Sequence, residues 1–548
     1  MGRSGRIADS ADVVVVGFGA AGVCAALAAR EQGAEVIALD RANGGGATAI
    51  SGGIVYAGGG TAVQRRAGVD DTVERMLAYL RLEVGDAVSP ATLESFVRSS
   101  PEMIDWLQRH GVPFDSTLCP YKTSYPNNRY YLYHSGSENA GAFRSHTPPV
   151  QRGHRVQGKG TSGKKLYGPL LHSALERGVD FRPHTTVTRL LQDSAGRVTG
   201  VEAATMGYAP PHIRRMYAAM AAVSSKPGIY YPPLRRAMEH RLRRLERRYA
   251  RPIRVAARRG VIICAGGFIA NPEWLHRYAP EFKNGLPLGT SGDDGSGIAL
   301  AESVGAVSQR MDNVSAWRFI TPPSAFLGAI IVDQRGQRII DESRYGAAIG
   351  QAMVKNHHGT GWILADAAVM REARRQLFTQ TLWFQRAQTA ALMLTGSVRA
   401  SSLAKAAAAA GIDPDGLRAT VDAHNNAIDS GAPDPAGKPS EFTRRIAKSP
   451  YTLLNISIRP SLLNPTPMLT LGGVRVDEAT GAVLTESGEP IPGLYGAGRC
   501  AVGVCSNSYV SGLSIADCVF SGRRAGTHAA KQSDDPSERN SGATGLVT

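Results

Sequence analysis

Alternating apolar and polar blocks divide the start of the chain into a predicted strand, turn, helix and strand. Residues 13–16 form an apolar run of buried-strand length, and residues 23–31 are rich in strong helix formers. A second predicted strand at 35–39 is followed by Asp40. The six residues between the first strand and the helix have the sequence GFGAAG, a complete GxGxxG. This order predicts a βαβ unit that binds a dinucleotide.

Each part of this motif has a physical role. Gly17 permits the tight turn, Gly19 lets the backbone touch a pyrophosphate, and Gly22 lets the helix pack on the strand. The carboxylate of Asp40 can accept a ribose hydroxyl. A glycine-rich surface turn is the alternative interpretation. The predicted contacts in this unit are Gly17, Gly19, Ala20, Ala21, Gly22, Asp40 and Arg41.

A second glycine-rich segment, residues 44–53, has side chains too small to cover its own amides. Such a segment can lie along a second phosphate or a flavin edge, although a solvent loop is the alternative. Residues 260–268 are predicted to return as a strand to the same sheet, and residues 292–297 to open a helix near a phosphate or ribityl group. The predicted contacts in these and neighbouring segments are Ala47, Thr48, Ser51, Gly52, Gly53, Val187, Ala265, Gly266 and Asp294.

Helix and strand patterns alternate around one irregular region. Amphipathic helices are predicted at 70–80, 90–110 and 166–177, and strands at 180–190 and 197–203. Residues 121–154 carry five tyrosines among Pro, Asn and Gly with little periodicity, so we expect a long functional loop.

The pattern changes between residues 311 and 447, which indicates a separate inserted domain. Short strands are predicted at 329–333 and 337–341, and Ala-rich helices at 401–410 and 414–430. His357 and His358 lack metal-ligand spacing and acidic partners, so we interpret them as surface residues. After residue 450 glycine-rich segments return, and residues 506–517 open a helix that continues to about residue 530.

The net charge of +16 is concentrated in one segment. Residues 213–259 contain fourteen Lys or Arg and two Glu, which accounts for +12 of the total. Two helices at 210–223 and 232–249 are predicted there, with interleaved Met and Tyr. A hairpin lying on an anionic membrane surface is one hypothesis, and a solvated basic helix pair or a subunit contact is the alternative. Nucleic-acid binding is not expected, because no RNP, zinc or helix-turn-helix signature accompanies the charge.

Cysteine spacing and hydropathy indicate a reduced compartment. The six cysteines show no CxxC and no paired spacing. No signal peptide is predicted, because residues 1–13 contain no apolar h-region. No spanning helix is predicted, because no apolar stretch approaches eighteen residues. We therefore expect a cytoplasmic protein, either free or peripheral on the inner face of the membrane.

Several motifs in order resemble the FAD-dependent fumarate reductase and 3-ketosteroid dehydrogenase superfamily. They are GFGAAG with Asp40, the AGGF strand end, TLGG, GLYGAGR and a closing SGLSIADCVFSGRRAG helix. The resemblance implies an α/β fold, with a Rossmann-type FAD-binding domain and an inserted α+β cap domain. The implied first FAD-binding part spans residues 10–285 and includes the basic insert at about 207–257. The cap spans 286–450, the second FAD-binding part 451–530, and a disordered tail 531–548. FAD is expected to be non-covalent, with further contacts from Gly498, Arg499, Ser514 and Ile515.

The same comparison separates the branches of the superfamily. In the fumarate reductases of this superfamily, a histidine and arginines bind the two carboxylates of the substrate. Residues 499–509 of this chain contain no histidine, and Tyr509 stands where an arginine is expected. The argument against a dicarboxylate substrate is still open, because Arg344 in the cap could bind a carboxylate. The sequence Tyr509-Val510-Ser511-Gly512 instead resembles the Δ4-(5α) type of 3-ketosteroid dehydrogenase, and the Tyr-Pro-Gly-Pro-type sequence of the Δ1 type is absent.

This branch implies a catalytic set of Tyr345, Tyr509, Ser511 and Gly512. Tyr509 OH and the Gly512 N–H are expected to stabilise enolate charge on a ring ketone. Tyr345 is expected to accept the α proton through a proton relay that includes Ser511, while FAD takes the hydride. The expected partners are a small apolar steroid-like ketone and an external electron acceptor. A dicarboxylate or enoate reductase, a Δ1-type dehydrogenase and a flavin-bearing electron-transfer subunit are the alternatives.

Overall fold

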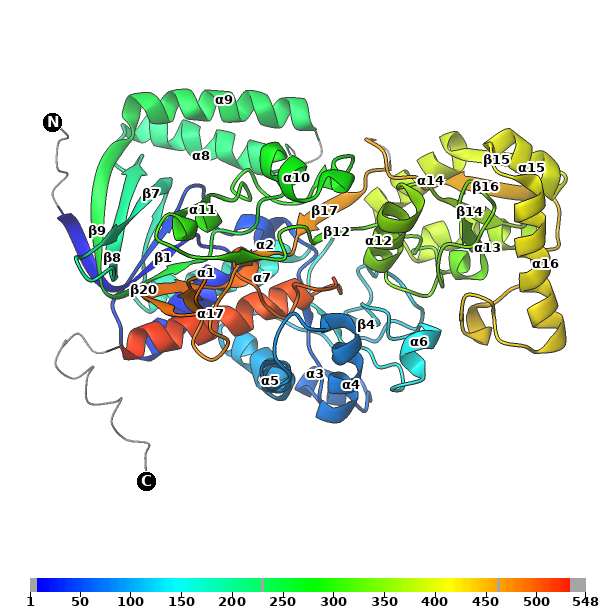
Figure 1. The fold of residues 1–548 in the computed structure, drawn as a ribbon, viewed down its shortest axis with the longest axis horizontal. Coiled ribbons are helices and arrows are strands. Elements are labelled where there is room, and N and C mark those ends of the chain that lie inside the picture. Colours follow the sequence, from blue (N-terminus) through cyan, green and yellow to red (C-terminus); the bar gives the residue numbers. More distant parts are fainter. Residues whose placement is uncertain (1–6, 227, 229–230, 461–463, 533–548) are drawn as a thin grey trace.

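The computed structural model describes residues 7–226, 228, 231–460 and 464–532 (Figure 1). Most of the tail predicted from residue 531 lies outside the described residues. The mixed α/β architecture confirms the expected fold class of a cofactor-binding domain with a cap, and Figure 1 shows the cap as a lobe at one end of the molecule.

A mainly parallel sheet forms the centre of the larger lobe. Its order is β19-β20-β9-β1-β2-β6, and β7 and β8 form an antiparallel extension on β9. The neighbours β9, β1, β2 and β6 run parallel, and β20 also pairs parallel with β9. The bounds are β1 Ile7–Val16, β2 Val36–Asp40, β6 Asp180–Pro183, β7 Thr185–Gln192, β8 Val198–Thr205, β9 Arg251–Ile263, β19 Ala482–Leu484 and β20 Pro490–Gly496.

Two apolar layers cover the two faces of this sheet. Val13 and Val15 of β1 point into a core shared with α1 (Ala20–Glu31), α7 (Gly163–Glu176) and α17 (Leu513–Lys531). Val14 and Val16 point to the other face, toward β8 and α11 (Ser296–Glu302). The predicted single strand at 180–190 is two strands, because His184 between β6 and β7 has a φ of +56°. The prediction of strand structure at 180–190 is confirmed, but the prediction of one continuous strand was wrong.

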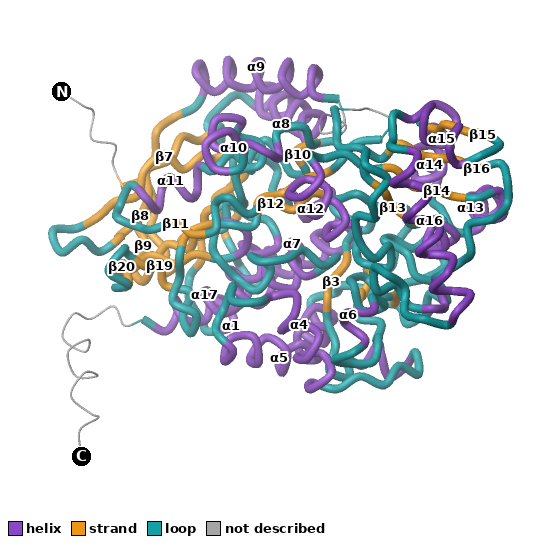
Figure 2. Tube along the Cα trace, turned by 45° about the vertical axis from the view of Figure 1, so that its right-hand side comes forward, coloured by secondary structure: helices purple, strands orange, loops and turns teal. Residues whose placement is uncertain are grey.

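The tyrosine-rich region is largely irregular, as predicted, but it contributes to a small three-stranded sheet. Its order is β3-β5-β4, with β3 Ile54–Tyr56, β4 Leu132–Tyr133 and β5 Gly153–Arg155. The helices of this part are α2 Gly46–Ile50, α3 Ala62–Arg66, α4 Val73–Val84, α5 Pro90–Arg109 and α6 Gly141–Arg144. Figures 1 and 2 show the tyrosine-rich region between the sheet of the larger lobe and the cap.

The cap is built on an antiparallel sheet with the order β13-β14-β16-β15. Its strands are β13 Ile330–Val332, β14 Trp362–Ala365, β15 Ser397–Ala400 and β16 Tyr451–Asn455. Its helices are α12 Gly346–His357, α13 Ala367–Thr379, α14 Trp383–Thr395, α15 Leu403–Ala410 and α16 Pro414–Ser430. Since β16 pairs with β14 and β15, the cap sheet continues five residues past position 450.

Short strands join the cap to the larger lobe. They are β10 Leu286–Pro287, β11 Ser308–Gln309, β12 Val314–Ala316, β17 Pro467–Thr470 and β18 Gly473–Val474. Helix α10 (Pro272–Tyr278) precedes this connection.

Two predictions in the cap were wrong. Residues 337–341 form no regular strand, and only an isolated bridge joins Val332 to Arg338. The Arg338 side chain is instead held by ion pairs to Glu342 and Asp434, at 2.6 and 3.0 Å. His357 is not a free surface residue, since its side chain is 13% exposed and its Nδ1 lies 3.2 Å from Asp333 Oδ2.

The basic insert forms the predicted helical hairpin, although it ends earlier than expected. Its helices α8 (Pro211–Ser225) and α9 (Pro232–Tyr249) lie side by side (Figure 1). Residues 251–257, which the sequence analysis included in the insert, form the start of β9 and pair with both β1 and β8. Four of the fourteen cations therefore belong to this strand, where Arg254 and Arg258 pair with Glu202 and Asp12.

None of the described helices combines the length and the apolar character needed to span a membrane.

Glycines let α17 approach α1 closely. A Cβ at Gly522 would lie 2.4 Å from Ala21 O, and one at Gly526 would lie 2.1 Å from Ala25 O. We expect Gly526→Ala to lower the free energy of unfolding by about 1–3 kcal/mol, because the helices must separate to admit the methyl group. Denaturant titration followed by circular dichroism measures this.

Gly168, inside α7, is the matched control. A Cβ there meets nothing within 4 Å. Gly168→Ala should therefore raise stability by roughly 0.5–1 kcal/mol. Equal effects of the two substitutions would contradict the close-packing interpretation.

Candidate functional site

The GxGxxG turn between β1 and α1 has the geometry that the sequence predicts. Gly17 has a φ of +90°, and a Cβ there would lie 2.7 Å from Cys264 O. A Cβ at Gly22 would lie 2.0 Å from Gly17 O, so this glycine permits the helix to pack on the turn. Gly19 differs, because a Cβ there would meet only Gly45 O and Thr48 Oγ1, at 3.8 and 3.9 Å. The space in front of Gly19 is therefore open.

Asp40 ends β2 beside this turn. Its carboxylate accepts hydrogen bonds from the N–H groups of Phe18 and Ala42, both at 2.8 Å. Thr48 Oγ1, in α2, accepts the Ala20 N–H at 3.2 Å, and thus ties the 44–53 segment to the start of α1. Thr48 is thereby placed beside the open face of Gly19, whereas Gly52 and Gly53 of the same segment lie against Tyr125 and Ser162.

Arg499 lies beside the glycine turn that follows β9. Its guanidinium pairs with Asp293, while its Nη1 is buried and has no hydrogen-bond partner in the described structure. Glycines 266 and 267 face it, since a Cβ on Gly267 would lie 3.7 Å from Nη1. Asp294, another predicted contact, is held by Arg41 at 2.7 Å.

The remaining predicted contacts come from four elements. Gly498 has a φ of +69° in a short turn before Arg499, and Ser514 and Ile515 lie in the first turn of α17. Val187 lies on β7, and Ala265 directly follows β9. An unpartnered guanidinium N–H, exposed glycine amides and helix starts form a donor set that fits a dinucleotide diphosphate and its polar ring. The residues present therefore fit FAD.

The predicted catalytic residues converge at the start of α17. Gly512 has a φ of +90°, and a Cβ there would lie 2.7 Å from Tyr56 N, so only glycine fits. Ser511 N–H donates to Ser135 O at 3.2 Å, and Ser135 Oγ donates back to Ser511 O at 3.1 Å. Tyr56 N–H donates to Gly512 O at 3.1 Å. Strand β3 and the 133–137 segment thereby fix this turn.

Both predicted catalytic tyrosines lie in one aromatic cluster between the lobes. The rings of Tyr345 and Tyr509 are 6.4 Å apart. Trp317 stacks on Tyr509 at 4.7 Å, and Phe319 lies 5.5 Å from Tyr345. Tyr345 precedes α12 of the cap, and Trp317 directly follows β12. The cluster therefore combines side chains from the cap with side chains from the C-terminal turn.

A family model described as "FAD binding domain" matches residues 12–514. The chain is also 37% identical over 500 residues to "3-oxo-5-alpha-steroid 4-dehydrogenase" of Comamonas testosteroni, covering 89% of this chain and 92% of the relative. The chain belongs to the FAD-dependent 3-oxosteroid dehydrogenase family. It is an oxidoreductase with FAD as its cofactor.

Two further comparisons agree with this membership. The crystal structure of "3-ketosteroid-delta4-(5alpha)-dehydrogenase" from Rhodococcus jostii RHA1, in complex with 4-androstene-3,17-dione, is similar with a TM-score of 0.81. It shares 31% identity and covers 96% of this chain and 98% of its own. A "3-oxosteroid 1-dehydrogenase" of Mycobacterium tuberculosis is 28% identical over 95% of this chain and 98% of its own length.

Within this family member, burial controls the ionisation of the tyrosines. Burial raises the pKa of Tyr345 well above its ordinary value, and a hydrogen bond with the Ser511 side chain opposes the rise. Burial also raises the pKa of Tyr509, opposed by Arg499 and by the Gly512 N–H. Tyr509 is therefore near both the predicted oxyanion donor Gly512 and the predicted FAD contact Arg499. Both phenols remain protonated at neutral pH.

Two residues of this FAD enzyme were missed by sequence reasoning. Tyr133 is fully buried, and its hydroxyl lies 3.4 Å from Ser511 Oγ. Trp317 stacks on Tyr509, as described above. The tyrosine-rich composition of residues 121–154 had indicated a functional loop but could not single out Tyr133. Nothing in the sequence around Trp317 distinguished it from a core tryptophan.

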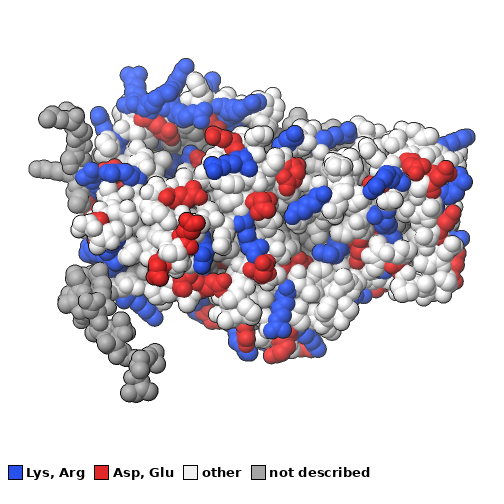
Figure 3. Space-filling view, in the orientation of Figure 1, with Lys and Arg blue, Asp and Glu red and all other residues white. Residues whose placement is uncertain are grey.

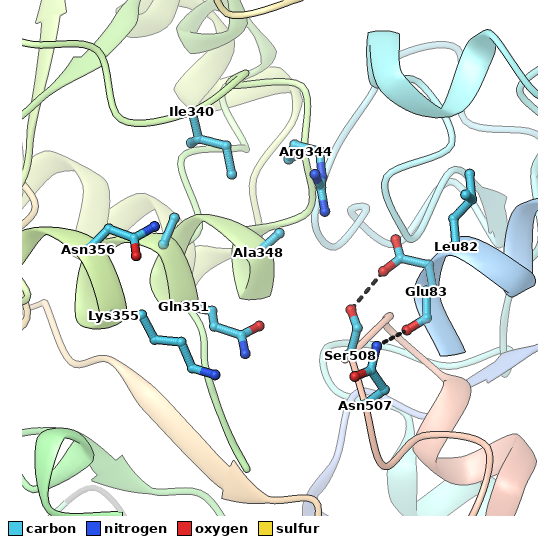
Figure 4. Close-up of a pocket in the computed structure, with 11 residues that line it drawn as sticks. Leu82, Glu83, Ile340, Arg344, Ala348, Gln351, Lys355, Asn356, Asn507 and Ser508 are labelled. Atoms are coloured by element: carbon cyan, nitrogen blue, oxygen red, sulfur yellow. Dashed lines mark hydrogen bonds between the residues drawn. The ribbon is translucent and has the colours of Figure 1, made fainter. Parts of the chain in front are cut away.

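Arg344 does not join the tyrosines. Its guanidinium stacks 4.8 Å from the Phe143 ring, and it lines a pocket of about 290 Å³ between α4 and α12. Figure 4 shows it facing that pocket, across from Glu83. In the part of the chain that the structure describes, no group of three or more His, Cys, Asp and Glu side chains could hold a metal.

The open face of Gly19 allows a direct test of FAD binding. Gly19 has a φ of −83°, which any residue can adopt. We expect Gly19→Val to fold normally, since its Cβ has room, but to bind FAD at least about tenfold more weakly, a cost of 1.4 kcal/mol or more. Flavin fluorescence titration of the apoprotein measures this. A folded variant with wild-type FAD affinity would refute the placement of the cofactor over this turn.

Proposed function

We propose that this chain is an FAD-dependent 3-oxosteroid dehydrogenase that introduces the Δ4 double bond into 3-oxo-5α-steroids. The observation that carries the proposal is the convergence of Tyr345, Tyr509, Ser511 and Gly512 within one neutral aromatic cluster. Similarity to two proteins named for this reaction supports it.

The substrate ketone is held by donors that favour charge on its oxygen. Tyr509 OH and the Gly512 N–H supply two such donors at the start of α17. Removal of the α proton then leaves enolate charge on that oxygen, which these donors stabilise more strongly than the neutral ketone. The surrounding rings of Trp317 and Phe319 exclude water and suit an apolar polycyclic substrate.

The α proton is transferred to Tyr345. Because burial raises its pKa, the phenol is neutral and a poor base by itself. It can accept the α proton only as it passes its own proton to the Ser511 hydroxyl. Ser511 must in turn give its proton to Tyr133 OH, 3.4 Å away, and the relay has to end at solvent. FAD, when bound, supplies a two-electron acceptor for the hydride from the β carbon. An external acceptor then has to reoxidise it.

The alternatives have less support. A dicarboxylate reductase needs paired cations at the substrate, but Arg344 faces the pocket beside Glu83 and Arg499 is engaged by Asp293. A Δ1-type dehydrogenase shares the overall similarity, although the sequence at Tyr509–Gly512 differs from that type.

We also propose that the α8–α9 hairpin rests on an anionic membrane, from which an apolar substrate can be drawn. Lys and Arg side chains gather over α9 in Figure 3. Its exposed arginines are Arg236, Arg241, Arg243, Arg244, Arg247 and Arg248. On α8, Met216 and Val223, seven positions apart, are 44% and 36% exposed, and Tyr231 beside α9 is 52% exposed. Cations beside exposed apolar groups are typical of an interfacial helix.

The catalytic proposal predicts the effect of one hydroxyl. Tyr509→Phe removes an oxyanion donor, so kcat with a 3-oxo-5α-steroid should fall by roughly 10²-fold. Stopped-flow bleaching of bound FAD under anaerobic conditions measures the step. Tyr121→Phe is the control, because its buried hydroxyl has no partner in the described structure. Unchanged kcat in Tyr509→Phe would reject the role.

The membrane proposal predicts a charge dependence. Replacing Arg243, Arg244 and Arg247 by Glu should weaken binding to phosphatidylserine vesicles by at least about 10²-fold, since each cation contributes about 1 kcal/mol. Co-sedimentation measures it. Deleting residues 207–257 is unsuitable, because residues 251–257 belong to β9.

The control for this experiment carries the same charge change elsewhere. Arg371, Arg374 and Arg418 are exposed on α13 and α16 of the cap, and their replacement by Glu should leave vesicle binding intact. Equal loss in both variants, or no binding by the wild type, would leave a solvated hairpin or a subunit contact as the better explanation.

A further inference from the structure

The segment that leads into Tyr509 has no regular secondary structure. Residues 502–510 form neither helix nor strand, so their position depends on contacts from outside the segment. Within the segment, Ser506 N–H donates to Gly503 O, and Gly503 N–H to Ser506 Oγ, both at 3.0 Å. These local bonds shape a turn but do not fix it relative to the rest of the molecule.

Glu83 near the end of α4 binds this segment twice. Its carboxylate Oε2 accepts the Ser508 hydroxyl at 2.7 Å, and its backbone carbonyl accepts Asn507 Nδ2 at 2.9 Å (Figure 4). The residue is 2% exposed. The other carboxylate oxygen accepts Tyr79 OH at 2.9 Å, which fixes the side chain from behind. Both Glu83 oxygens therefore have a hydroxyl donor.

Asn313 also binds the same segment. Its Nδ2 donates to Ser506 O and to Asn507 O, each at 2.7 Å. Asn313 directly precedes β12, after which Trp317 stacks on Tyr509. The segment is thus clamped between α4 and the strand that leads to the aromatic cluster.

We infer that Glu83 is a positioning residue for Tyr509, acting through the hydroxyl of Ser508. This inference rests on the proposed role of Tyr509 as an oxyanion donor. Ser508 is covalently adjacent to Tyr509, so a shift at its hydroxyl moves the Tyr509 backbone directly. A carboxylate suits the position because it only accepts hydrogen bonds and can satisfy two hydroxyls at once. An oxyanion donor must be placed before the reaction begins, and a misplacement near 1 Å can cost roughly 10²-fold in rate.

The test compares Glu83→Leu with Glu83→Gln in the FAD-loaded full-length protein. Leucine has a similar size but no hydrogen-bonding group, whereas the glutamine amide can still bridge Tyr79 OH and Ser508 OH. We expect Glu83→Leu to lower kcat by about 10- to 100-fold with KM changed less than about threefold, since the lost contact acts in the transition state. Glu83→Gln should restore kcat to within about threefold of wild type. Ser508→Ala should reproduce the loss, and combining it with Glu83→Leu should add little.

Hydrogen exchange at residues 506–510 provides a readout that does not depend on catalysis. Exchange should be faster in Glu83→Leu and Ser508→Ala and unchanged in Glu83→Gln, because only the first two release the segment. If Glu83→Leu fails to fold, Ser508→Ala alone decides, because it leaves α4 intact.

The outcomes separate this inference from the proposed function. Wild-type kcat or unchanged exchange in Ser508→Ala would overturn the positioning role, as would an equal loss of kcat in Glu83→Gln and Glu83→Leu. A Tyr509→Phe enzyme with wild-type kcat would instead remove the proposed function of Tyr509. In that case faster exchange in Glu83→Leu would still show that Glu83 anchors the segment. The inference that Glu83 raises kcat by positioning Tyr509 would be rejected.

Discussion

The close approach of α17 to the N-terminal part of the chain is the constraint on which the site depends. Glycines at 512, 522 and 526 bring the backbone of this helix against β3 and α1, where a methyl group would lie 2.1–2.7 Å from backbone atoms. The same contact sets the helix start that presents Gly512 and Ser511. Since α1 also follows the GxGxxG turn, a single packing interface fixes both that turn and the turn proposed to be catalytic.

The cofactor side of the site contains charged side chains, whereas the tyrosine cluster consists of neutral ones. On the cofactor side, Arg499 and Arg41 are buried or half-buried beside Asp293 and Asp294, which favours a polar, anionic ligand. Around Tyr345 and Tyr509, burial raises the pKa of each phenol, so these proposed substrate contacts are neutral donors. Neutral donors can bind a neutral ketone without a charged partner, whereas a dicarboxylate beside them would be desolvated without compensation.

The sequence predicts what depends on local chemistry and misses what depends on distant partners. The GxGxxG turn and its helix could be located because Gly17 and Gly22 satisfy local steric needs, while Gly19 leaves open space beside the backbone. The strand expected at 337–341 is absent because Glu342, in a buried network with Arg338 and Lys438, determines that segment. Tyr133 was missed since its partner Ser511 is 378 positions away. The domain boundaries and the roles of the site residues remain predictions.

Buried polar contacts help to place the tyrosine-rich segment. Arg155 is fully buried, and its guanidinium donates to backbone carbonyls of the loop, including Asn127 O at 2.6 Å and Gly160 O at 2.7 Å. The rings of Tyr125 and Tyr131 lie 4.9 and 5.1 Å from it. A buried cation is costly unless its donors are used, so the loop is stable only in the conformation that supplies those carbonyls. That conformation brings Tyr133, on the neighbouring strand β4, to Ser511, so an irregular loop can hold a catalytic neighbour as firmly as a sheet does.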